Sequence, residues 1–325
     1  MQAYHTIETP INAVGAVSIL RIVSDDMEWV CGLLKINPLS PGQIRLGSIV
    51  HLDEALLACF EPGSLLIMPH GGIGITKAIS EALNQLGIQY KQPSDPQAMF
   101  PEAEDVHEAR MLQALAIAPS PMAVDVLLDQ PRRWRGFCDE QPCADARMMN
   151  RLLVPPIVVA VGRANIGKSS LVNALAGASV AMVSDHAGTT RDHVGVMLDL
   201  GGLVVRWVDT PGVDETVAVG EELKLVGPVF QSADLVIHAI DHDDAQGQLD
   251  PRLIDLINPM IPTLRVRVRS DLGAGIDGLD CADYADCSCS SQTGEGIQTL
   301  AQTIKERLVP SEALADPRPW RFWDS

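Results

Sequence analysis

Apolar residues in the first 92 positions form two short strand-like runs and one longer run with helical spacing. The short runs are AVSILRIV at residues 16–23 and LLACF at 56–60. The longer run, ITKAISEALNQLG, places apolar side chains three or four residues apart and ends in a glycine. This spacing predicts a helix over residues 75–87 that the glycine terminates. Two strands followed by a helix predict a small α+β domain over residues 1–92.

Residues 93–150 carry a different pattern, in which a proline-rich stretch precedes two amphipathic runs. The stretch KQPSDPQAMFPEAED interrupts regular structure. The runs EDVHEARMLQALAIA and SPMAVDVLLDQPRRW then predict two helices. Arg132, Arg133 and Arg135 form a basic cluster at the end of the second run. We interpret this cluster as a solvated helix end in preference to an RNA contact, and the whole region as a helical connector.

Between residues 151 and 310, apolar runs alternate with loops and helical patterns. IVVAVG at 157–162 and ADLVIHAID at 233–241 are apolar over most of their length, as expected of parallel strands buried on both faces. The alternation predicts an α/β domain with a doubly wound, mostly parallel sheet. A short tail, residues 311–325, follows with two prolines and two tryptophans.

Composition narrows the class of protein. Apolar residues make up 46% of the chain and the net charge is −18, so a globular protein that does not coat nucleic acid electrostatically is expected. RNA contact through a local patch or a partner stays open. The first residues, MQAYHTIETP, lack a signal-peptide pattern, and no apolar run reaches the roughly 18 residues of a membrane span. We therefore predict a cytoplasmic protein without membrane contact.

The sequence GRANIGKSS, residues 162–170, has the spacing of a phosphate-binding loop. The glycines allow the backbone to turn its N–H groups toward a phosphate, and the helix that follows adds its positive N-terminus. Lys168 is expected to reach the β- and γ-phosphates, and the Ser169 hydroxyl to bind Mg²⁺. The preceding strand and the following helix favour this interpretation over an ordinary glycine-rich turn.

Two further segments predict a nucleotide switch. DTPG, residues 209–212, follows the apolar run LVVRWV, so its Asp can hold Mg²⁺ through water and its Gly can donate an N–H to a γ-phosphate. GTTRD, residues 188–192, lies between the phosphate loop and that strand. A GTPase has a mobile segment with a Mg²⁺-binding threonine in this place. The three segments in this order are typical of a GTPase switch.

Together, GRANIGKSSLVNALAG, SDHAGTTRD and VDTPGV resemble the Era/MnmE branch of translation-associated GTPases. The segments IETPINAVGAVSILRI and ACFEPGSLLIMPHGG resemble the N-terminal domain of the tRNA-modification GTPase family MnmE, also called TrmE, and EARMLQALAIAPSPMAVDVLLDQ resembles the start of its helical domain. The resemblance implies a P-loop GTPase domain, a homodimer formed through the N-terminal domain, a partner enzyme in tRNA modification, and indirect contact with tRNA.

The resemblance also implies roles for single residues. In this family a loop asparagine helps to hold a K⁺ ion that offsets charge between the β- and γ-phosphates. The matching K⁺ positions here are Asn165, Ser184, His186 and Thr189, although Asn165 can also be read as an ordinary polar loop residue. The implied Mg²⁺ ligands are Ser169, Thr190 and Asp209. The implied catalytic residues are Lys168, Thr190 and a glutamate that orients the attacking water. Glu221 and Glu222 are the candidates for this glutamate, although their distance along the chain from the DTPG segment differs from that in the family.

Guanine recognition departs from the family pattern. The usual N-K-x-D is replaced by VRSD at residues 268–271, so Asp271 is retained, Arg269 stands where the lysine packs on the base, and Val268 cannot supply an amide. One such hydrogen bond contributes roughly 0.5–1.5 kcal/mol, so guanine preference should weaken without vanishing. SSQTGEG at 290–296 stands where a loop caps the base. The predicted nucleotide contacts are Asn165, Ile166, Gly167, Lys168, Ser169, Ser170, Asp209, Thr210, Pro211, Gly212, Arg269, Asp271, Ser290 and Ser291.

Other departures concern modification chemistry. Arg21 matches a family arginine that contacts formyl-tetrahydrofolate, but the segment with the acidic folate contact is shortened to SLLIMP, and the segment with a lysine contact is absent near residues 90–103. The family's terminal Cys-x-Gly-Lys has no counterpart in RFWDS. Two hypotheses follow. The first is a GTPase that hydrolyses GTP with Mg²⁺ and responds to K⁺; the alternative is a divergent nucleotide-binding scaffold or regulator that has lost tRNA modification.

Overall fold

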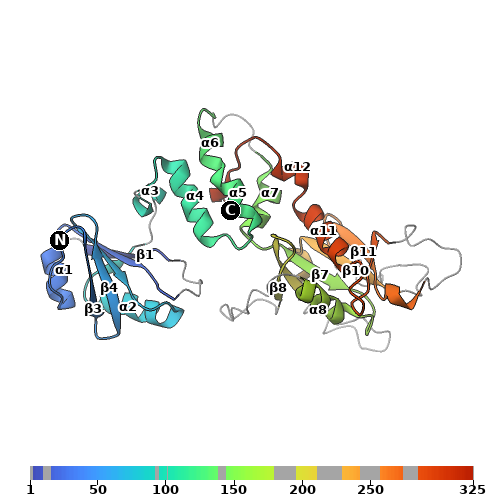
Figure 1. The fold of residues 1–325 in the computed structure, drawn as a ribbon, viewed down its shortest axis with the longest axis horizontal. Coiled ribbons are helices and arrows are strands. Elements are labelled where there is room, and N and C mark those ends of the chain that lie inside the picture. The colour runs from blue at the N-terminus through green and yellow to red at the C-terminus, as the bar shows by residue number, and fades with distance from the viewer. Residues whose placement is uncertain are drawn as a thin grey trace. The chain divides into compact units, whose positions relative to one another are not determined.

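The chain folds into two compact units, Met1–Ile117 and Ala118–Ser325 (Figure 1). The computed structural model describes residues 3–9, 16–91, 95–100, 102–137, 144–178, 195–210, 229–241, 257–273 and 285–324. We treat each unit separately. The four-part division drawn from the sequence, with boundaries near 92, 150 and 310, stays a prediction.

The first unit contains a six-stranded sheet and four described helices. The strands are β1 (Ala3–Ile7), β2 (Leu20–Ser24), β3 (Gln43–Ile49), β4 (Asp53–Cys59), β5 (Ser64–Met68) and β6 (Gln89–Tyr90), in the order β3-β4-β5-β2-β1-β6. The strand pairs are antiparallel except β1 with β6. The described helices are α1 (Met27–Leu34), α2 (Ile73–Gln85), α3 (Pro96–Met99) and α4 (Val106–Ile117). This arrangement confirms the α+β class, and α2 and α4 confirm two predicted helices.

The core of this unit lies between the sheet and two helices. Leu57, Ile67 and Leu20 from the strands are completely buried against Val30 of α1 and Ile79 of α2. Helix α1 was not predicted from the sequence. It begins where the Asp26 carboxylate accepts a hydrogen bond from the Trp29 N–H at 2.9 Å. Both helices therefore cover the same face of the sheet.

The opposite face, which we call the outer sheet face, carries apolar side chains aligned across three strands. Register places Leu46 opposite Leu56, and Leu56 opposite Met68. Because side chains alternate along a strand, these residues point away from the helix-covered core. Leu46 is 63% exposed and Leu56 is 45% exposed. The outer sheet face is defined by Ile44, Leu46, Leu56, Leu66 and Met68.

The second unit contains a mostly parallel sheet, as predicted. Its strands are β7 (Ile157–Val161), β8 (Val196–Asp199), β9 (Val204–Asp209), β10 (Leu235–Ile240), β11 (Thr263–Arg267) and β12 (Cys287–Ser288), in the order β12-β11-β10-β7-β9-β8. Among the strands that the structure describes in this unit, only β8 runs antiparallel to its neighbour. Helices α8 (Lys168–Ala178) and α11 (Ile297–Leu308) contact each other. Phe230 packs against the strand residues Val159 and Val161.

Short helices and the chain's last residues pack together in this unit. They are α5 (Met122–Leu128), α6 (Gln130–Trp134), α7 (Ala146–Met149), η1 (Asn150–Leu152), α12 (Ser311–Leu314) and η4 (Phe322–Asp324). The single helix predicted over residues 120–134 is wrong at its centre, because α5 ends at Leu128 and α6 begins at Gln130. Pro131 explains the break, since proline has no N–H to donate to the carbonyl four residues before it, so the helix cannot continue its hydrogen bonding there.

The tail is part of the folded unit. Trp320 is completely buried, its backbone N–H donates to the Gln130 side chain at 2.7 Å, and its Nε1 donates to Asn150 at 2.8 Å.

Two arginines of the basic cluster form ion pairs with one carboxylate of the same unit. The Asp129 carboxylate accepts from Arg132 Nε at 2.7 Å and from Arg133 Nε at 2.6 Å. These guanidinium groups lower the pKa of Asp129 to about 2. The pairing favours the interpretation as a helix end over an RNA contact.

None of the helices in the described parts of the chain is both long and apolar enough to cross a bilayer. Helix η2 (Ser270–Leu272), which follows β11, completes the described elements and belongs to the site considered next.

Candidate nucleotide-binding site

The phosphate loop lies at the carboxyl edge of the parallel sheet, between β7 and α8. Ligands in open α/β sheets bind at this edge. Gly162 has φ 153°, and a Cβ there would lie 2.7 Å from the Ala239 carbonyl oxygen of β10, so only glycine allows the two strands to approach as they do. Helix α8 begins as the Leu171 N–H donates to the Gly167 carbonyl at 2.9 Å. The strand–loop–helix order predicted from the sequence is therefore present.

Lys168 turns back toward the loop that precedes it. Its side chain is largely buried, and Nζ donates to the carbonyls of Gly162 at 3.2 Å and Arg163 at 3.0 Å. Burial lowers the pKa of Lys168, and the nearby Asp209 carboxylate opposes that shift. The ammonium group thus stands inside the loop, close to where a phosphate would be cradled.

Ser169 and Asp209 bring two oxygen groups together from different elements. Ser169 Oγ, in the first turn of α8, donates to Asp209 Oδ2 at the end of β9, over 2.5 Å. Strand β9 pairs with β7, with Ala160 opposite Asp209, and the next residue, Thr210, donates its hydroxyl to the Ala160 carbonyl at 2.7 Å. A hydroxyl and a carboxylate are donors that Mg²⁺ accepts, with phosphate and water completing the coordination. These residues fit the predicted Mg²⁺ site.

The segment VRSD follows β11 at the same edge of the sheet. The Val268 N–H donates to the Ile240 carbonyl at 2.9 Å, and its side chain is buried. Asp271 lies in η2 and is exposed. Arg269 has a left-handed backbone with φ 58°, and its Nη2 donates to the Asn165 carbonyl of the phosphate loop. The predicted base-reading segment therefore touches the predicted phosphate loop.

The loop at residues 290–296 is held beside this segment. The Ser270 N–H donates to the Cys289 carbonyl at 3.1 Å, and the buried Ser290 hydroxyl accepts from the N–H groups of Gln292 and Thr293 at 3.2 and 3.1 Å. A Cβ on Gly296 would lie 2.1 Å from the Ser288 carbonyl, so this tight turn requires glycine. The Ser290 side chain thus stabilises the loop itself.

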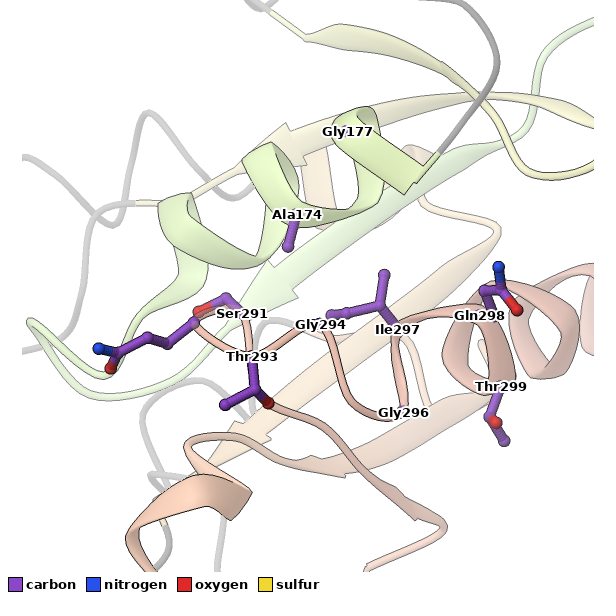
Figure 2. A pocket seen from close by; sticks show the side chains of 10 residues that line it. Ala174, Gly177, Ser291, Thr293, Gly294, Gly296, Ile297, Gln298 and Thr299 are labelled. Carbon is purple, nitrogen blue, oxygen red and sulfur yellow. The ribbon is translucent and has the colours of Figure 1, made fainter.

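A hollow of about 570 Å³ opens between this loop and α8. Figure 2 shows Ala174 of α8 pointing toward the loop that carries Ser291, with Ile297 at the start of α11 pointing toward the same helix. Hydroxyl, amide and glycine residues line most of the hollow, and Ser291 is the lining residue that we predicted to contact the base.

Several predicted site residues lie outside the described parts of the chain. They include most of the predicted K⁺ set, the switch threonine, the end of the DTPG segment and both glutamate candidates: Ser184, His186, Thr189, Thr190, Pro211, Gly212, Glu221 and Glu222. Of the K⁺ set, Asn165 is described; it is exposed and has φ 60°.

Arg21, the predicted folate contact, is engaged by an acid of the same unit. Its Nε and Nη2 donate to the two carboxylate oxygens of Glu8 at 2.6 and 3.1 Å, and Glu61 lies 3.7 Å from its Nη1. Arg21 and Glu8 are each 16% exposed at the side chain. An anionic ligand would have to displace Glu8, so this arrangement does not fit folate binding at Arg21.

Asp241 was missed from the sequence. It follows β10 directly, and its Oδ2 lies 3.3 Å from Arg269 Nη1. Its position at the end of the apolar run ADLVIHAID, at the carboxyl edge of a predicted parallel strand, was the signal that could have indicated it.

Comparison with known proteins agrees with this geometry. Residues 157–266 match the family described as 50S ribosome-binding GTPase. A sheet of this order with a phosphate loop after β7 and an aspartate at the end of β9, together with that match, defines a P-loop GTPase domain.

The curated relatives point to one type of GTPase. The tRNA modification GTPase MnmE of Acidiphilium cryptum is 29% identical over 373 aligned residues, which span 94% of this chain and 82% of that protein. MnmE of Methylorubrum populi is 40% identical over 164 residues, half of this chain and 34% of that protein, and MnmE of Ralstonia nicotianae is 36% identical over 163 residues. The chain is thus similar over most of its length to a tRNA modification GTPase of the MnmE type.

Several of these alignments span only about a third of the relative's length, as for the proteins of Methylorubrum populi and Ralstonia nicotianae. Among solved structures, Era in complex with MgGDPNP and a segment of 16S ribosomal RNA is similar over 47% of this chain, at 25% identity and a TM-score of 0.36. The relationship therefore rests on the sequence matches.

Proposed function

We propose that this chain binds GTP and hydrolyses it with Mg²⁺. The observation that carries the proposal is the approach of Ser169 Oγ to Asp209 Oδ2 at 2.5 Å, immediately after Lys168 in the phosphate loop. A hydroxyl and a carboxylate that meet beside a buried ammonium are the donors that a Mg²⁺–triphosphate requires. The match of residues 157–266 to a GTPase family supports the same proposal.

Each residue has a distinct part in this proposal. Lys168 would exchange the Gly162 and Arg163 carbonyls for phosphate oxygens, which places positive charge where negative charge develops during transfer. Ser169 and Asp209 would hold the ion, directly and through water. Thr190 is proposed as the third ligand, and Glu221 or Glu222 as the group that orients the attacking water.

We further propose that K⁺ accelerates the reaction through Asn165, with Ser184, His186 and Thr189 completing the site. The support is the resemblance to MnmE and the exposed position of Asn165 on the phosphate loop. A monovalent cation there would offset charge between the β- and γ-phosphates. We expect GTP turnover to be faster in KCl than in NaCl. Equal rates in the two salts would refute the role of K⁺ and leave the proposed GTP hydrolysis untouched.

The base site is proposed to favour guanine weakly. Asp271 is exposed and able to accept from the base, whereas Val268 is buried and offers no polar group. Arg269 and the loop of Ser290 and Ser291 would bound the base. Weakened discrimination between GTP and ATP is the expected result.

A homodimer formed through the outer sheet face is proposed for the N-terminal unit. Leu46, Leu56 and Met68 lie side by side across three strands, and the helices pack on the other face. A second copy would offer the same apolar surface, as a twofold interface requires. Exposed apolar patches of this kind mark association surfaces.

Whether the chain takes part in tRNA modification separates two candidate roles. The relatives named tRNA modification GTPase MnmE support a role in tRNA modification. A cytoplasmic location, a partner enzyme and indirect contact with tRNA are proposed with that role, on the resemblance alone. The alternative, a nucleotide-binding scaffold without this chemistry, is favoured by Arg21, whose guanidinium is held by Glu8. Restoration of modified wobble uridine in cells that lack the relative would support the first role.

The primary test is phosphate release from GTP and from ATP, measured with Mg²⁺ in KCl and in NaCl. Lys168→Ala is the matched inactive variant, and Lys305→Ala, at a partly exposed lysine of α11, controls for loss of a positive charge. We expect turnover of GTP that Lys168→Ala abolishes. Binding without turnover would favour the scaffold, and neither binding nor turnover would refute both.

A further inference from the structure

The Glu8 carboxylate and the Arg21 guanidinium form a two-point ion pair in the first unit. The two oxygens of Glu8 accept from Arg21 Nε at 2.6 Å and from Nη2 at 3.1 Å, and one of them also accepts from the Thr6 hydroxyl at 3.3 Å. Paired N–H···O bonds of this kind match the planar fork of an arginine to the two oxygens of a carboxylate. Glu8 therefore makes the contact with Arg21 that the carboxylate of a bound ligand would make.

The pairing of β1 with β2 brings these side chains to one face of the sheet. Thr6 stands opposite Arg21 in this antiparallel pair, and the Glu8 N–H continues the ladder by donating to the Ile19 carbonyl at 2.9 Å. Because side chains alternate along a strand, Glu8 lies on the same face as Thr6 and Arg21. Leu20, the neighbour of Arg21 in the chain, points into the core instead.

The ion pair shares its face with the outer sheet face. Arg21 stands opposite Leu66 of β5, which is one of the residues that define the outer sheet face. An unpaired guanidinium beside Leu66 would carry its charge into any contact made by this face, and a charge that is buried without a partner is strongly destabilising. The pairing with Glu8 compensates the charge of Arg21 before any contact forms.

A second carboxylate makes a longer and more exposed contact with the same guanidinium. Glu61 Oε1 lies 3.7 Å from Arg21 Nη1, and the Glu61 side chain is 58% exposed. Burial disfavours the charged form of Arg21, but Glu8, together with Glu61 and Glu102, outweighs the effect of burial and raises the pKa of Arg21. Arg21 therefore stays a cation, and Glu8 is the acid that holds it directly.

We propose that Glu8 is an intramolecular ligand of Arg21, which takes the place of an exogenous carboxylate and lets the first unit fold and associate without folate. The part that concerns association rests on the proposed homodimer, whereas the part that concerns folding rests on the ion pair alone. A chain that supplies this carboxylate from its own sequence needs no one-carbon donor at Arg21. The arrangement therefore favours the role without modification chemistry.

Chemical rescue tests whether Arg21 accepts a carboxylate from solution once Glu8 is removed. Hydrogen exchange of the peptides that cover residues 3–9 and 16–24 is measured in the purified full-length protein without nucleotide. Glu8→Ala should exchange roughly tenfold faster there than the unaltered chain, the effect of losing a charge-assisted hydrogen bond. Sodium acetate should slow the exchange again, and sodium chloride at equal ionic strength should not, because chloride lacks the two oxygens that match the fork.

The chain offers a matched control at the same guanidinium. Glu61→Ala removes a carboxylate from the exposed side of Arg21 and should leave the exchange unchanged in either salt. Glu8→Ala combined with Arg21→Ala should exchange fast in both salts, since acetate then has no guanidinium to bind. Glu8→Gln keeps the volume of the side chain, so it gives the same comparison with the unaltered chain if Glu8→Ala does not fold.

The same variants test association. The dissociation constant of the proposed homodimer, measured by sedimentation over a dilution series, should rise at least about fivefold in Glu8→Ala, because the charge of Arg21 is then uncompensated in the interface. Acetate should lower the constant of Glu8→Ala, and Glu61→Ala should match the unaltered chain. Formyl-tetrahydrofolate should change neither the dissociation constant nor the exchange of the unaltered chain.

Rapid exchange in Glu8→Ala that acetate does not slow would overturn the proposal, because Arg21 would then not be a carboxylate site. Protection of the unaltered chain by formyl-tetrahydrofolate would overturn it as well, since a ligand from solution would then displace Glu8. An unaltered chain that stays monomeric at every concentration would refute the proposed homodimer and with it the part on association, while the exchange experiment would still decide the part on folding. Failure to hydrolyse GTP would refute the proposed GTPase activity alone, since none of these measurements uses nucleotide.

Discussion

Ser169 Oγ donates to Asp209 Oδ2 at 2.5 Å, which joins the first turn of α8 to the carboxyl end of β9. The two residues are 40 positions apart and meet because β7 and β9 are parallel neighbours. The hydroxyl and the carboxylate stand where a Mg²⁺–triphosphate is expected, so the contact supplies the most direct test of the proposed activity.

Ser169→Ala should lower GTP turnover at least about a hundredfold, because it removes a proposed Mg²⁺ ligand beside the developing charge. Phosphate release at increasing Mg²⁺ measures the effect, and a higher Mg²⁺ requirement is expected as well. Ser40→Ala, at an exposed serine of the first unit, is the control. Unchanged turnover and Mg²⁺ dependence in Ser169→Ala would contradict the assignment.

Val268→Asn should strengthen guanine discrimination by about two- to tenfold, the equivalent of one recovered hydrogen bond. The ratio of GDP to ADP affinity, measured by competition, reports the change. Val268 is buried, so thermal unfolding of the variant should be recorded alongside. An unchanged or smaller ratio in a folded variant would show that this position does not read the base.

Formyl-tetrahydrofolate should bind the unaltered chain very weakly, because Glu8 occupies two donors of Arg21. Glu8→Ala removes that competitor and should raise the affinity, whereas Glu8→Ala combined with Arg21→Ala should not. Isothermal titration measures all three proteins. Tight binding by the unaltered chain would show that Glu8 is readily displaced.

Leu46→Asp and Leu56→Asp should convert a dimer to a monomer, because each places a charge on the outer sheet face. Light scattering after size exclusion gives the mass. Leu128→Asp, at a leucine of the second unit that is 54% exposed, is the matched control and should leave the mass unchanged. A dimer that survives both changes would place the interface elsewhere.

The first unit should lose stability as the pH falls below about 6.5. His5 is completely buried, with Nδ1 2.9 Å from the Ile88 carbonyl and Nε2 2.7 Å from Ser80 Oγ. Burial lowers the pKa of His5 below its ordinary value of 6.5, and the bond to Ile88 opposes the shift in part. The unfolded chain therefore binds a proton that the folded chain does not, and the free energy of unfolding decreases as pH falls through that window.

Urea unfolding between pH 5.5 and 7.5, followed in the full chain, measures this dependence. His5→Gln should be less stable at every pH but should flatten the slope. A slope that is the same in both proteins would assign the pH dependence to other groups.

The sequence alone was sufficient to predict those parts of the structure that are formed by residues close together in the chain. The phosphate loop, its strand and its helix are contiguous, so their spacing alone predicted their order, and the apolar runs predicted a mostly parallel sheet. The prediction of a single helix over residues 120–134 was wrong, because Pro131 interrupts the helix although the apolar spacing continues past it.

Contacts between residues far apart in the sequence could not be predicted from local patterns. Arg269 meets Asn165 across 104 residues and Asp241 across 28, and only the order β11-β10-β7 brings the three to one edge. Alternation along β3 and β4 indicates two faces, but the packing of α1 and α2 decides which face is covered. Glu8 reaches Arg21 because β1 and β2 pair in antiparallel register. The sequence therefore determined the chemistry of the loop and the class of the fold, whereas strand order and register, which depend on burial summed over the whole unit, decided which side chains meet.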